Sequence, residues 1–320
     1  GRTPLTSALH SLATWLSTST NDRRHAWLVF ATLLASFAYF YQGTGPNQNS
    51  RFDLTRAIVD HATFAIDAYA GNTIDKAEAR GHFYSDKAPG LSFAAAPAYG
   101  AVRMAQGFAP PTPASERLAL YLLTVTVVGA TSAAAGARLF VMLRRMQISA
   151  PAGLAAVFAW GLGTNGFAYA TIFVAHSFVA ALVALALCLL HGVFTRSAAT
   201  GGGRVAPGTA FAGLLVGWAT ISEYPASLVG ACIFVYGVWR LGAKAMAWFV
   251  VGAALPLLAL GAYNASCFGS PFTLGYQRLS EPAFRGVIQL GFFGISAPSP
   301  TVMAELLFGE FRGILPLAPW

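Results

Sequence analysis

Residues 81–90, GHFYSDKAPG, hold the side chains best suited to chemistry in a chain that is otherwise poor in charge. They include an imidazole, a phenol, an acid and a base: His82, Tyr84, Asp86 and Lys87. Lysine is a compact point charge that suits a phosphate. Pro89 is typical of the first turn of a helix, and the positive dipole end of that helix attracts an anion. We therefore expect Lys87 to contact a phosphate group; the alternative is a plain surface ion pair between Asp86 and Lys87.

Carboxylates near a phosphate site indicate a general base, because a positioned aspartate can take the proton of an acceptor hydroxyl or amine. Residues 43–116 hold seven of the twelve acidic residues: Asp53, Asp60, Asp67, Asp75, Glu78, Asp86 and Glu116. Residues 50–64 fit an amphipathic helix with Asp53, Arg56 and Asp60 on one face. Asp53 and Asp86 are the candidate bases. Asp53 also fits a helix cap, because SRFD at residues 50–53 resembles a capping box.

Two further polar residues stand at the ends of apolar runs. Glu223 lies beside Ile221 and Tyr224, where a carboxylate is costly and therefore indicates function. His176 begins an apolar run and fits either a site residue or a helix cap at the membrane surface. We expect both on the same membrane face as the first loop and count both among the substrate-binding residues.

The composition predicts an integral membrane protein. The chain has 320 residues, of which 56% are hydrophobic and 10% charged, with a mean hydropathy of +0.57, whereas soluble domains carry about 25% charged residues. The net charge of +8 reflects basic loops and not nucleic-acid binding. The three cysteines, Cys188, Cys232 and Cys267, have no metal-ligand or disulfide spacing. We identify no metal ligands, and the sequence is compatible with both the presence and the absence of a divalent cation.

Hydropathy and the placement of arginines predict the topology. Residues 1–25 form a cytoplasmic N-terminus, 26–42 the first span and 43–116 a long outer loop. Six further spans fill residues 117–263, at 117–143, 153–173, 176–194, 209–222, 225–239 and 245–263. Residues 264–320 lie outside and lead toward a further span, so we expect the chain to be incomplete. The glycine-rich residues 201–204 are a flexible inner linker.

Residues 91–108 allow two interpretations, because they are apolar but contain Pro97 and Arg103. If they cross the membrane, the arginines after the next span fall outside. If they lie along the membrane surface, those arginines fall in the cytoplasm: Arg138, Arg144 and Arg145. The second interpretation makes every later loop consistent with the positive-inside rule. We therefore expect a juxtamembrane helix here.

Several motifs resemble one family. Arg51-Phe52 resembles an Arg-Tyr that follows an acidic pair, and YSDKAP at residues 84–89 resembles Tyr-Phe-Asp-Lys-Pro-Pro. Both motifs are found in the GT-C superfamily of polyprenyl-phosphate-sugar-dependent glycosyltransferases, nearest the protein O-mannosyltransferase and aminoarabinose transferase branch. FGSPFTLGY at residues 268–276 and LFGEFRG at residues 307–313 resemble two later outer-face segments of bacterial members.

The resemblance implies a GT-C-type multi-span helical bundle with a long first outer loop that carries juxtamembrane helices. It implies a bacterial inner-membrane enzyme that moves a sugar from a polyprenyl-phosphate carrier to a lipid, glycan or protein acceptor on the periplasmic face. An acid of the first loop would be the base, and the other site residues would bind the phosphate or substrate: Arg51, His82, Tyr84, Lys87, His176 and Glu223. The chain departs from the pattern at Gln48-Asn49, where the family has its acidic pair, so Asp53 and then Asp86 are the substitutes.

A transporter or a lipid-handling subunit of a larger complex is the alternative. Transporters of many folds contain internal repeats and broken helices near the bilayer midplane. This sequence has no evident repeat, and its polar residues gather toward one face. The pattern therefore favours an enzyme, while the substitution of the acidic pair keeps a non-catalytic relative open.

Overall fold

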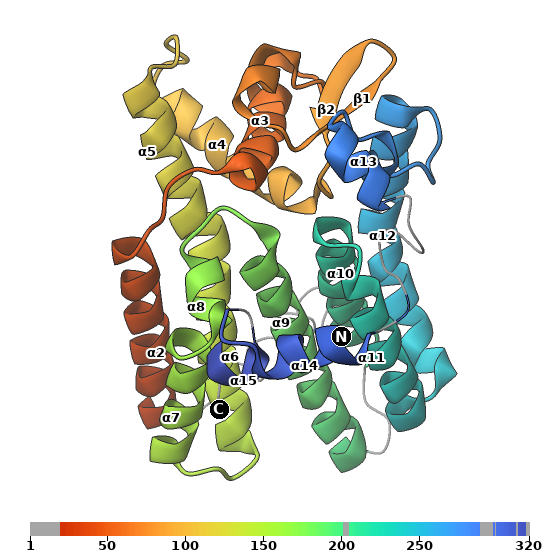
Figure 1. Cartoon of the computed structure of the whole chain (residues 1–320). Coiled ribbons are helices and arrows are strands. Elements are labelled where there is room, and N and C mark those ends of the chain that lie inside the picture. Colours follow the sequence, from red (N-terminus) through yellow and green to blue (C-terminus); the bar gives the residue numbers. More distant parts are fainter. Residues whose placement is uncertain (1–19, 201–204, 289–296, 298, 312, 318–320) are drawn as a thin grey trace.

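The structure is a computed structural model that describes residues 20–200, 205–288, 297, 299–311 and 313–317. The described chain is almost entirely helical, with one two-stranded hairpin (Figure 1). The elements of the first half are α2 (Thr20–Tyr39), α3 (Pro46–His61), η1 (Asp67–Asn72), β1 (Lys76–Ala79), β2 (His82–Ser85), α4 (Gly90–Ala105), α5 (Pro113–Leu123), η2 (Thr124–Gly129), α6 (Ala130–Arg145) and α7 (Ala150–Leu162). The second half holds α8 (Asn165–Ala170), α9 (Ala175–Thr200), α10 (Ala206–Ser222), α11 (Ala226–Leu241), α12 (Ala243–Phe268), η3 (Gly275–Arg278), α13 (Pro282–Ile288), α14 (Pro300–Phe308) and α15 (Ile314–Leu317).

Three described helical segments are long and apolar enough to cross a membrane: Pro113–Arg145, Ala175–Ser197 and Ala243–Phe268. The first is one rod made of α5, the π-helical turn η2 and α6. Three shorter apolar helices, α7, α10 and α11, lie in the same bundle (Figure 1). The architecture is compatible with an all-α membrane protein.

The long helices contain three of the predicted spans, at 117–143, 176–194 and 245–263. The predicted spans at 26–42, 209–222 and 225–239 correspond to α2, α10 and α11. Helices α10 and α11 are apolar but shorter than a spanning helix, and α2 is long enough but not sufficiently apolar. The total of seven spans and their orientation stay predictions. The inner linker at 201–204 and residues 1–19 of the N-terminal segment lie outside the described residues.

The predicted span at 153–173 is wrong as a single helix, because the chain forms α7 and then α8. Thr164 separates them with an extended backbone, and its side chain accepts a hydrogen bond from the Gly166 amide at 3.1 Å. That bond satisfies one of the free amides at the start of α8. A local cap of this kind ends an apolar run without any change in hydropathy.

Helices α10 and α12 pack with their backbones in direct contact. A Cβ atom on Gly213 would lie 1.9 Å from the Phe249 carbonyl oxygen, and one on Gly252 would lie 1.8 Å from the Ala210 carbonyl oxygen. Small residues allow this close approach between membrane helices. The pair therefore forms a rigid support beneath the segments that carry the polar residues.

A cap of α3, η1, the hairpin and α4 lies across one end of the bundle (Figure 1). The Phe52 ring of α3 packs edge-on against Tyr99 of α4, with ring centroids 5.6 Å apart. Both join an apolar core that also takes in Leu123 and Phe173 of the bundle. Helix α4 thus belongs to the cap, and its position along the membrane surface stays a prediction.

Helix α3 begins four residues before the predicted start and ends at His61. Gly45 precedes it with an extended backbone, and Pro46 occupies its first turn. Ala62 ends it in the left-handed region, at φ 51°. Ser50 and Asp53 therefore lie inside the helix, and the proposed capping box at residues 50–53 is wrong.

The hairpin β1–β2 presents the predicted motif to the bundle. The strands are antiparallel, with Lys76 opposite Ser85 and Ala79 opposite His82. Arg80 and Gly81 form the two-residue turn, both with positive φ, as a type I′ turn requires. The hairpin fixes the direction in which residues 86–89 leave the sheet and enter α4.

Candidate functional site

Lys87 lies in a buried acidic environment where the hairpin meets α4. Its Nζ atom is 3.2 Å from Asp86 Oδ2 and 3.1 Å from Asp75 Oδ2. The side chain of Lys87 is 11% exposed, and those of Asp86 and Asp75 are 2% and 13% exposed. The interpretation of Asp86 and Lys87 as a surface ion pair is therefore wrong, because the pair is buried and includes a third group.

The electrostatics keep Lys87 charged. Burial lowers the pKa of Lys87, but Asp86, Tyr276 and Asp75 outweigh it and raise that pKa above its ordinary value. Burial raises the pKa of Asp86, an effect that Lys87 opposes. The site thus combines a stable cation with a carboxyl group that binds a proton more readily than a solvated aspartate.

Arg51 joins the cap to the bundle. Its Nη2 atom is 2.6 Å from Glu223 Oε1, and its side chain is 1% exposed. Its Nη1 atom donates to the backbone oxygens of Ala88, at 3.2 Å, and Ser222, at 3.4 Å. One guanidinium therefore holds α3, the end of the hairpin segment and the end of α10 together.

His176 meets the same carboxylate from α9. Its Nδ1 atom lies 3.6 Å from Glu223 Oε1, and its side chain is 47% exposed. Its ring packs edge-on against Tyr169, with centroids 4.7 Å apart. His176 therefore stands at the exposed side of the Arg51–Glu223 pair and does not cap α9 by any bond found among the described residues.

Two tyrosines from outside the first loop complete the surroundings. Tyr276 of η3 packs edge-on against Tyr224, with ring centroids 5.9 Å apart, and the Lys87 Nζ lies 5.7 Å from the centre of the Tyr276 ring. A Cβ atom on Gly275 would approach the Asp86 carbonyl oxygen to 2.8 Å. Only glycine permits this contact, which brings residues 275–278 against the motif.

We call this group the Lys87 cluster, and its members come from five parts of the chain: Arg51, Asp75, Asp86, Lys87, His176, Glu223, Tyr224 and Tyr276. Five of them are site residues predicted from the sequence: Arg51, Asp86, Lys87, His176 and Glu223. Asp75, Tyr224 and Tyr276 were not predicted. The acidic content of residues 43–116 and the motif at 268–276 were the signals that could have indicated Asp75 and Tyr276.

His82 and Tyr84 lie in the same hairpin but have other partners. His82 Nδ1 is 2.6 Å from Asp67 Oδ2 on the exposed side of the hairpin. Tyr84 is buried and packs edge-on against Phe268, with ring centroids 5.6 Å apart. Successive residues of a strand point to opposite faces, so His82 and Tyr84 share one face of β2 and Phe83 takes the other. Their roles as substrate-binding residues stay predictions.

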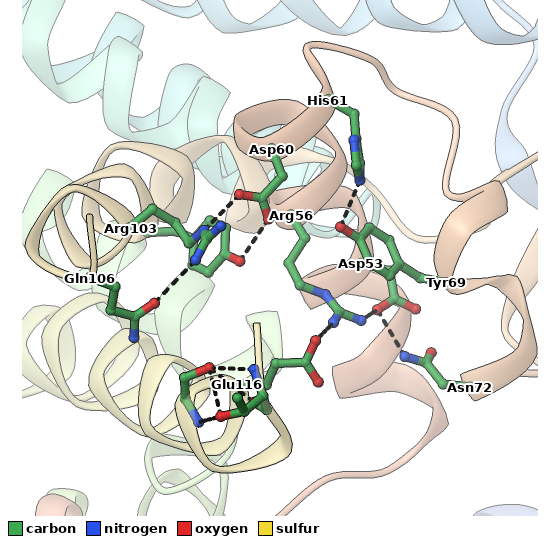
Figure 2. A network of polar contacts seen from close by, with 12 residues as sticks. Asp53, Arg56, Asp60, His61, Tyr69, Asn72, Arg103, Gln106 and Glu116 are labelled. Carbon is green, nitrogen blue, oxygen red and sulfur yellow. Dashed lines mark hydrogen bonds and ion pairs between the residues drawn. The ribbon is translucent and has the colours of Figure 1, made fainter. Parts of the chain in front are cut away.

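Asp53 belongs to a second polar network, on the side of α3 that faces α5 (Figure 2). Its Oδ1 atom lies 2.5 Å from Arg56 Nη2 and accepts from Asn72 Nδ2 at 3.2 Å. The Nη1 atom of Arg56 reaches Glu116 Oε1, also at 2.5 Å. Asp53 is 0% exposed, and its Oδ2 atom has no hydrogen-bond partner among the described residues.

The same network shapes the titration of Asp53 and borders a cavity. Burial raises the pKa of Asp53 to about 6, although Arg56 and Asn72 act in the opposite direction. The cavity, of about 390 Å³, lies between α3 and the start of α5 and is lined in part by Arg56, Asn72 and Glu116. Asp53 does not line the cavity, but the Arg56 guanidinium that binds it does (Figure 2).

The far end of α3 is tied to α4 by an acid. Asp60 accepts from Arg103 Nε and from the Tyr99 hydroxyl, each at 2.8 Å (Figure 2). Arg103 also donates to the Ala109 carbonyl at 2.8 Å. Asp53, Arg56 and Asp60 therefore share the face of α3 predicted for them, and Asp60 has a clear role in holding the cap together.

A cation site is not formed by protein ligands alone in the part of the chain described. No group of three or more His, Cys, Asp or Glu side chains is placed to hold a metal ion there. Asp75 and Asp86 come close to each other, but the Lys87 ammonium occupies the position between them. The geometry therefore allows both a metal-dependent and a metal-independent activity.

Comparison with known proteins adds no relative. No protein-family model, no curated protein and no solved structure matches the chain. The functional argument therefore rests on the residues and their geometry.

Proposed function

We propose that the protein is a membrane glycosyltransferase of GT-C type. It would move a sugar from a polyprenyl-phosphate carrier to a lipid, glycan or protein acceptor on the periplasmic face of a bacterial inner membrane. The observation that carries the proposal is the convergence of Arg51, Lys87 and His176, from three separate segments, at the junction of cap and bundle.

The chemistry of this convergence suits a phosphate at the membrane surface. Arg51 and Lys87 are buried side chains held in place by carboxylates, and fixed positive groups stabilise the charge that develops on a phosphate leaving group. Lys87 also lies three residues before the start of α4, whose free amides add positive potential. A donor whose tail lies in lipid would bring its phosphate to this level.

The charge distribution along the bundle supports the proposed orientation. The helix ends remote from the cap (Figure 1) carry the acid Asp22 and seven basic residues: Arg23, Arg24, Arg144, Arg145, Arg196, Arg240 and Lys244. Basic ends favour the cytoplasm. The cap and the Lys87 cluster would then lie on the outer face, with the N-terminus inside.

An aspartate of the first loop is proposed as the general base. Asp86 contacts Lys87 directly, whereas Asp53 is engaged by Arg56 and Asn72. The geometry therefore favours Asp86, and Asp53 is the second candidate. Release of undecaprenyl phosphate from a panel of undecaprenyl-phosphate-linked sugars distinguishes them: we expect loss in Asp86→Asn and retention in Asp53→Asn, and the reverse result would reassign the base.

Binding of undecaprenyl phosphate to the purified protein in nanodiscs tests the phosphate site. We expect saturable binding by the wild type and at least tenfold weaker binding by Lys87→Met. Lys76→Met is the matched control, since Lys76 lies in the same hairpin segment but donates to the Ala70 carbonyl. Equal binding by Lys87→Met would refute the phosphate role of Lys87.

A lipid-handling protein without transfer activity is the second candidate. Gln48-Asn49 stands where the resembled family has its acidic pair, which favours binding without chemistry. Saturable binding of undecaprenyl phosphate together with no release from any donor in the panel would support this alternative.

A further inference from the structure

A groove between α2 and α6 lies toward the end of the bundle remote from the cap. It has a volume of about 510 Å³ and is formed by four residues of each helix: Arg23, Ala26, Trp27 and Phe30, and Ala134, Ala137, Arg138 and Val141. The volume falls within the range of about 300–1,000 Å³ that is typical of small-molecule sites. Neither the proposed transfer reaction nor the Lys87 cluster uses any of these residues.

The packing of the two helices explains why the groove exists. Farther along α2, Leu33 fills the space beside Gly136, where a Cβ atom would lie 2.6 Å from Leu33 Cδ1. At the helix ends, Arg144 Nε binds Asp22 Oδ1 at 2.8 Å. Three of the eight residues that line the groove are alanines, which are too small to fill the gap: Ala26, Ala134 and Ala137. The groove is therefore part of how these helices pack.

The lining is apolar along its length and positive at two points. Six of the eight lining residues are apolar, and the other two are arginines, Arg23 and Arg138. No acid is among the residues that line it, and the nearby acid Asp22 is engaged by Arg144. An anionic group attached to a hydrocarbon chain is complementary to this pattern.

Arg138 stands at an unusual depth for a charged residue. It lies seven residues before the end of the apolar rod at Arg145, which is about 10 Å along the helix axis. Ionisable residues within a membrane segment mark functional sites by default. Trp27, which is 65% exposed on the groove wall, is a residue type enriched at the membrane interface.

We propose that this groove binds one anionic phospholipid from the leaflet opposite the Lys87 cluster. The phosphodiester would lie between Arg23 and Arg138, and an acyl chain would lie against Ala26, Phe30 and Ala137. Basic pockets between membrane helices are known to hold anionic head groups. The site would fix α2 against α6 and make the protein dependent on the anionic lipid content of its membrane.

Native mass spectrometry of the detergent-purified protein, titrated with phosphatidylglycerol or phosphatidylcholine, tests the proposal. We expect one phosphatidylglycerol to bind more tightly than phosphatidylcholine. Its affinity should fall about fivefold in Arg23→Gln and further in Arg23→Gln/Arg138→Gln. The control is Arg240→Gln, at the same end of the bundle, whose guanidinium contacts Tyr236 and Phe194 instead. Equal loss in the control would mean that overall charge, and not the groove, holds the lipid.

A second variant keeps the proposal testable if Arg138→Gln does not fold. Ala137→Leu fills the groove and leaves both arginines in place, so it should reduce phosphatidylglycerol binding at unchanged net charge. Unchanged binding in both Ala137→Leu and Arg23→Gln would overturn the proposal, as would equal affinity of the wild type for the two lipids. That result would favour residues 1–19 of the chain, or a second copy of the chain, as the occupant of the groove.

The lipid site and the polyprenyl-phosphate site are separable in the same experiments. Lys87→Met should retain the phosphatidylglycerol bound between α2 and α6. Arg23→Gln should retain the binding of undecaprenyl phosphate in nanodiscs. Either proposal can therefore fail while the other holds.

Discussion

Arg51 of α3 and Glu223 at the end of α10 form a buried ion pair, with Nη2 and Oε1 2.6 Å apart across 172 residues of sequence. The same guanidinium binds the carbonyls of Ala88 and Ser222. The pair therefore determines how the cap sits on the bundle. Because Arg51 binds the carbonyl of Ala88, the residue after Lys87, the position of Lys87 depends on this contact.

Replacement of Arg51 by leucine should lower the free energy of unfolding by about 3–5 kcal/mol, because Glu223 is left partly buried without its partner. Thermal unfolding in detergent measures the loss as a drop in midpoint. Arg24→Leu is the control, since Arg24 is exposed on α2 and should change stability by about 0.5 kcal/mol or less. Partial recovery in Arg51→Leu/Glu223→Leu is expected, and no recovery would show that the bonds to the two carbonyls dominate.

Asp53 should make stability depend on pH in one direction. Its pKa is raised from 3.8 to about 6, chiefly by burial, so the folded state binds the proton more tightly than the unfolded state. The stabilisation from Asp53 is therefore full below about pH 4 and is lost as pH rises through 6, by on the order of 3 kcal/mol.

Unfolding of wild type and Asp53→Asn between pH 4 and 7 measures this dependence. The wild type should lose stability across the window relative to the variant. Asp86, whose pKa is also raised, is present in both proteins, so its contribution cancels in the difference. Parallel pH curves would contradict the assigned pKa of Asp53.

Gly90 should tolerate no side chain, because α4 begins directly against α10. A Cβ atom there would lie 2.3 Å from Ser222 Oγ and 2.8 Å from the Ile221 carbonyl oxygen. Gly90→Ala is expected to cost about 1–3 kcal/mol through overpacking. It should also weaken undecaprenyl phosphate binding by moving the start of α4 away from α10.

Gly100 provides the matched control for that prediction. It lies in the same helix, and a Cβ atom on it would meet nothing within 4 Å. Gly100→Ala should be neutral or stabilise α4 by up to about 1 kcal/mol, because alanine is the better helix former. Equal thermal midpoints for the two variants would show that α4 can move away from α10 without cost.

The site could be predicted only in part from the sequence. Arg51, Asp86, Lys87, His176 and Glu223 were selected by residue type, by motif and by their positions at the ends of apolar runs, and the structure places them together. Asp53 was selected in the same way but lies in the Arg56 network. Helical periodicity predicts the face of the helix on which a side chain lies. It does not predict which other element packs against that face.

The sequence by itself determined the long apolar helices, the polar first loop and a helix near residues 50–64, because hydropathy and periodicity act within short windows. It did not predict the hairpin β1–β2 with its turn at Arg80-Gly81. The tertiary structure alone decided which elements meet. The pairing of Arg51 with Glu223, the position of Asp75 beside Lys87 and the break at Thr164 depend on packing or capping contacts. Such contacts form between residues distant in the chain, or through a single side-chain bond, and leave no periodic signal.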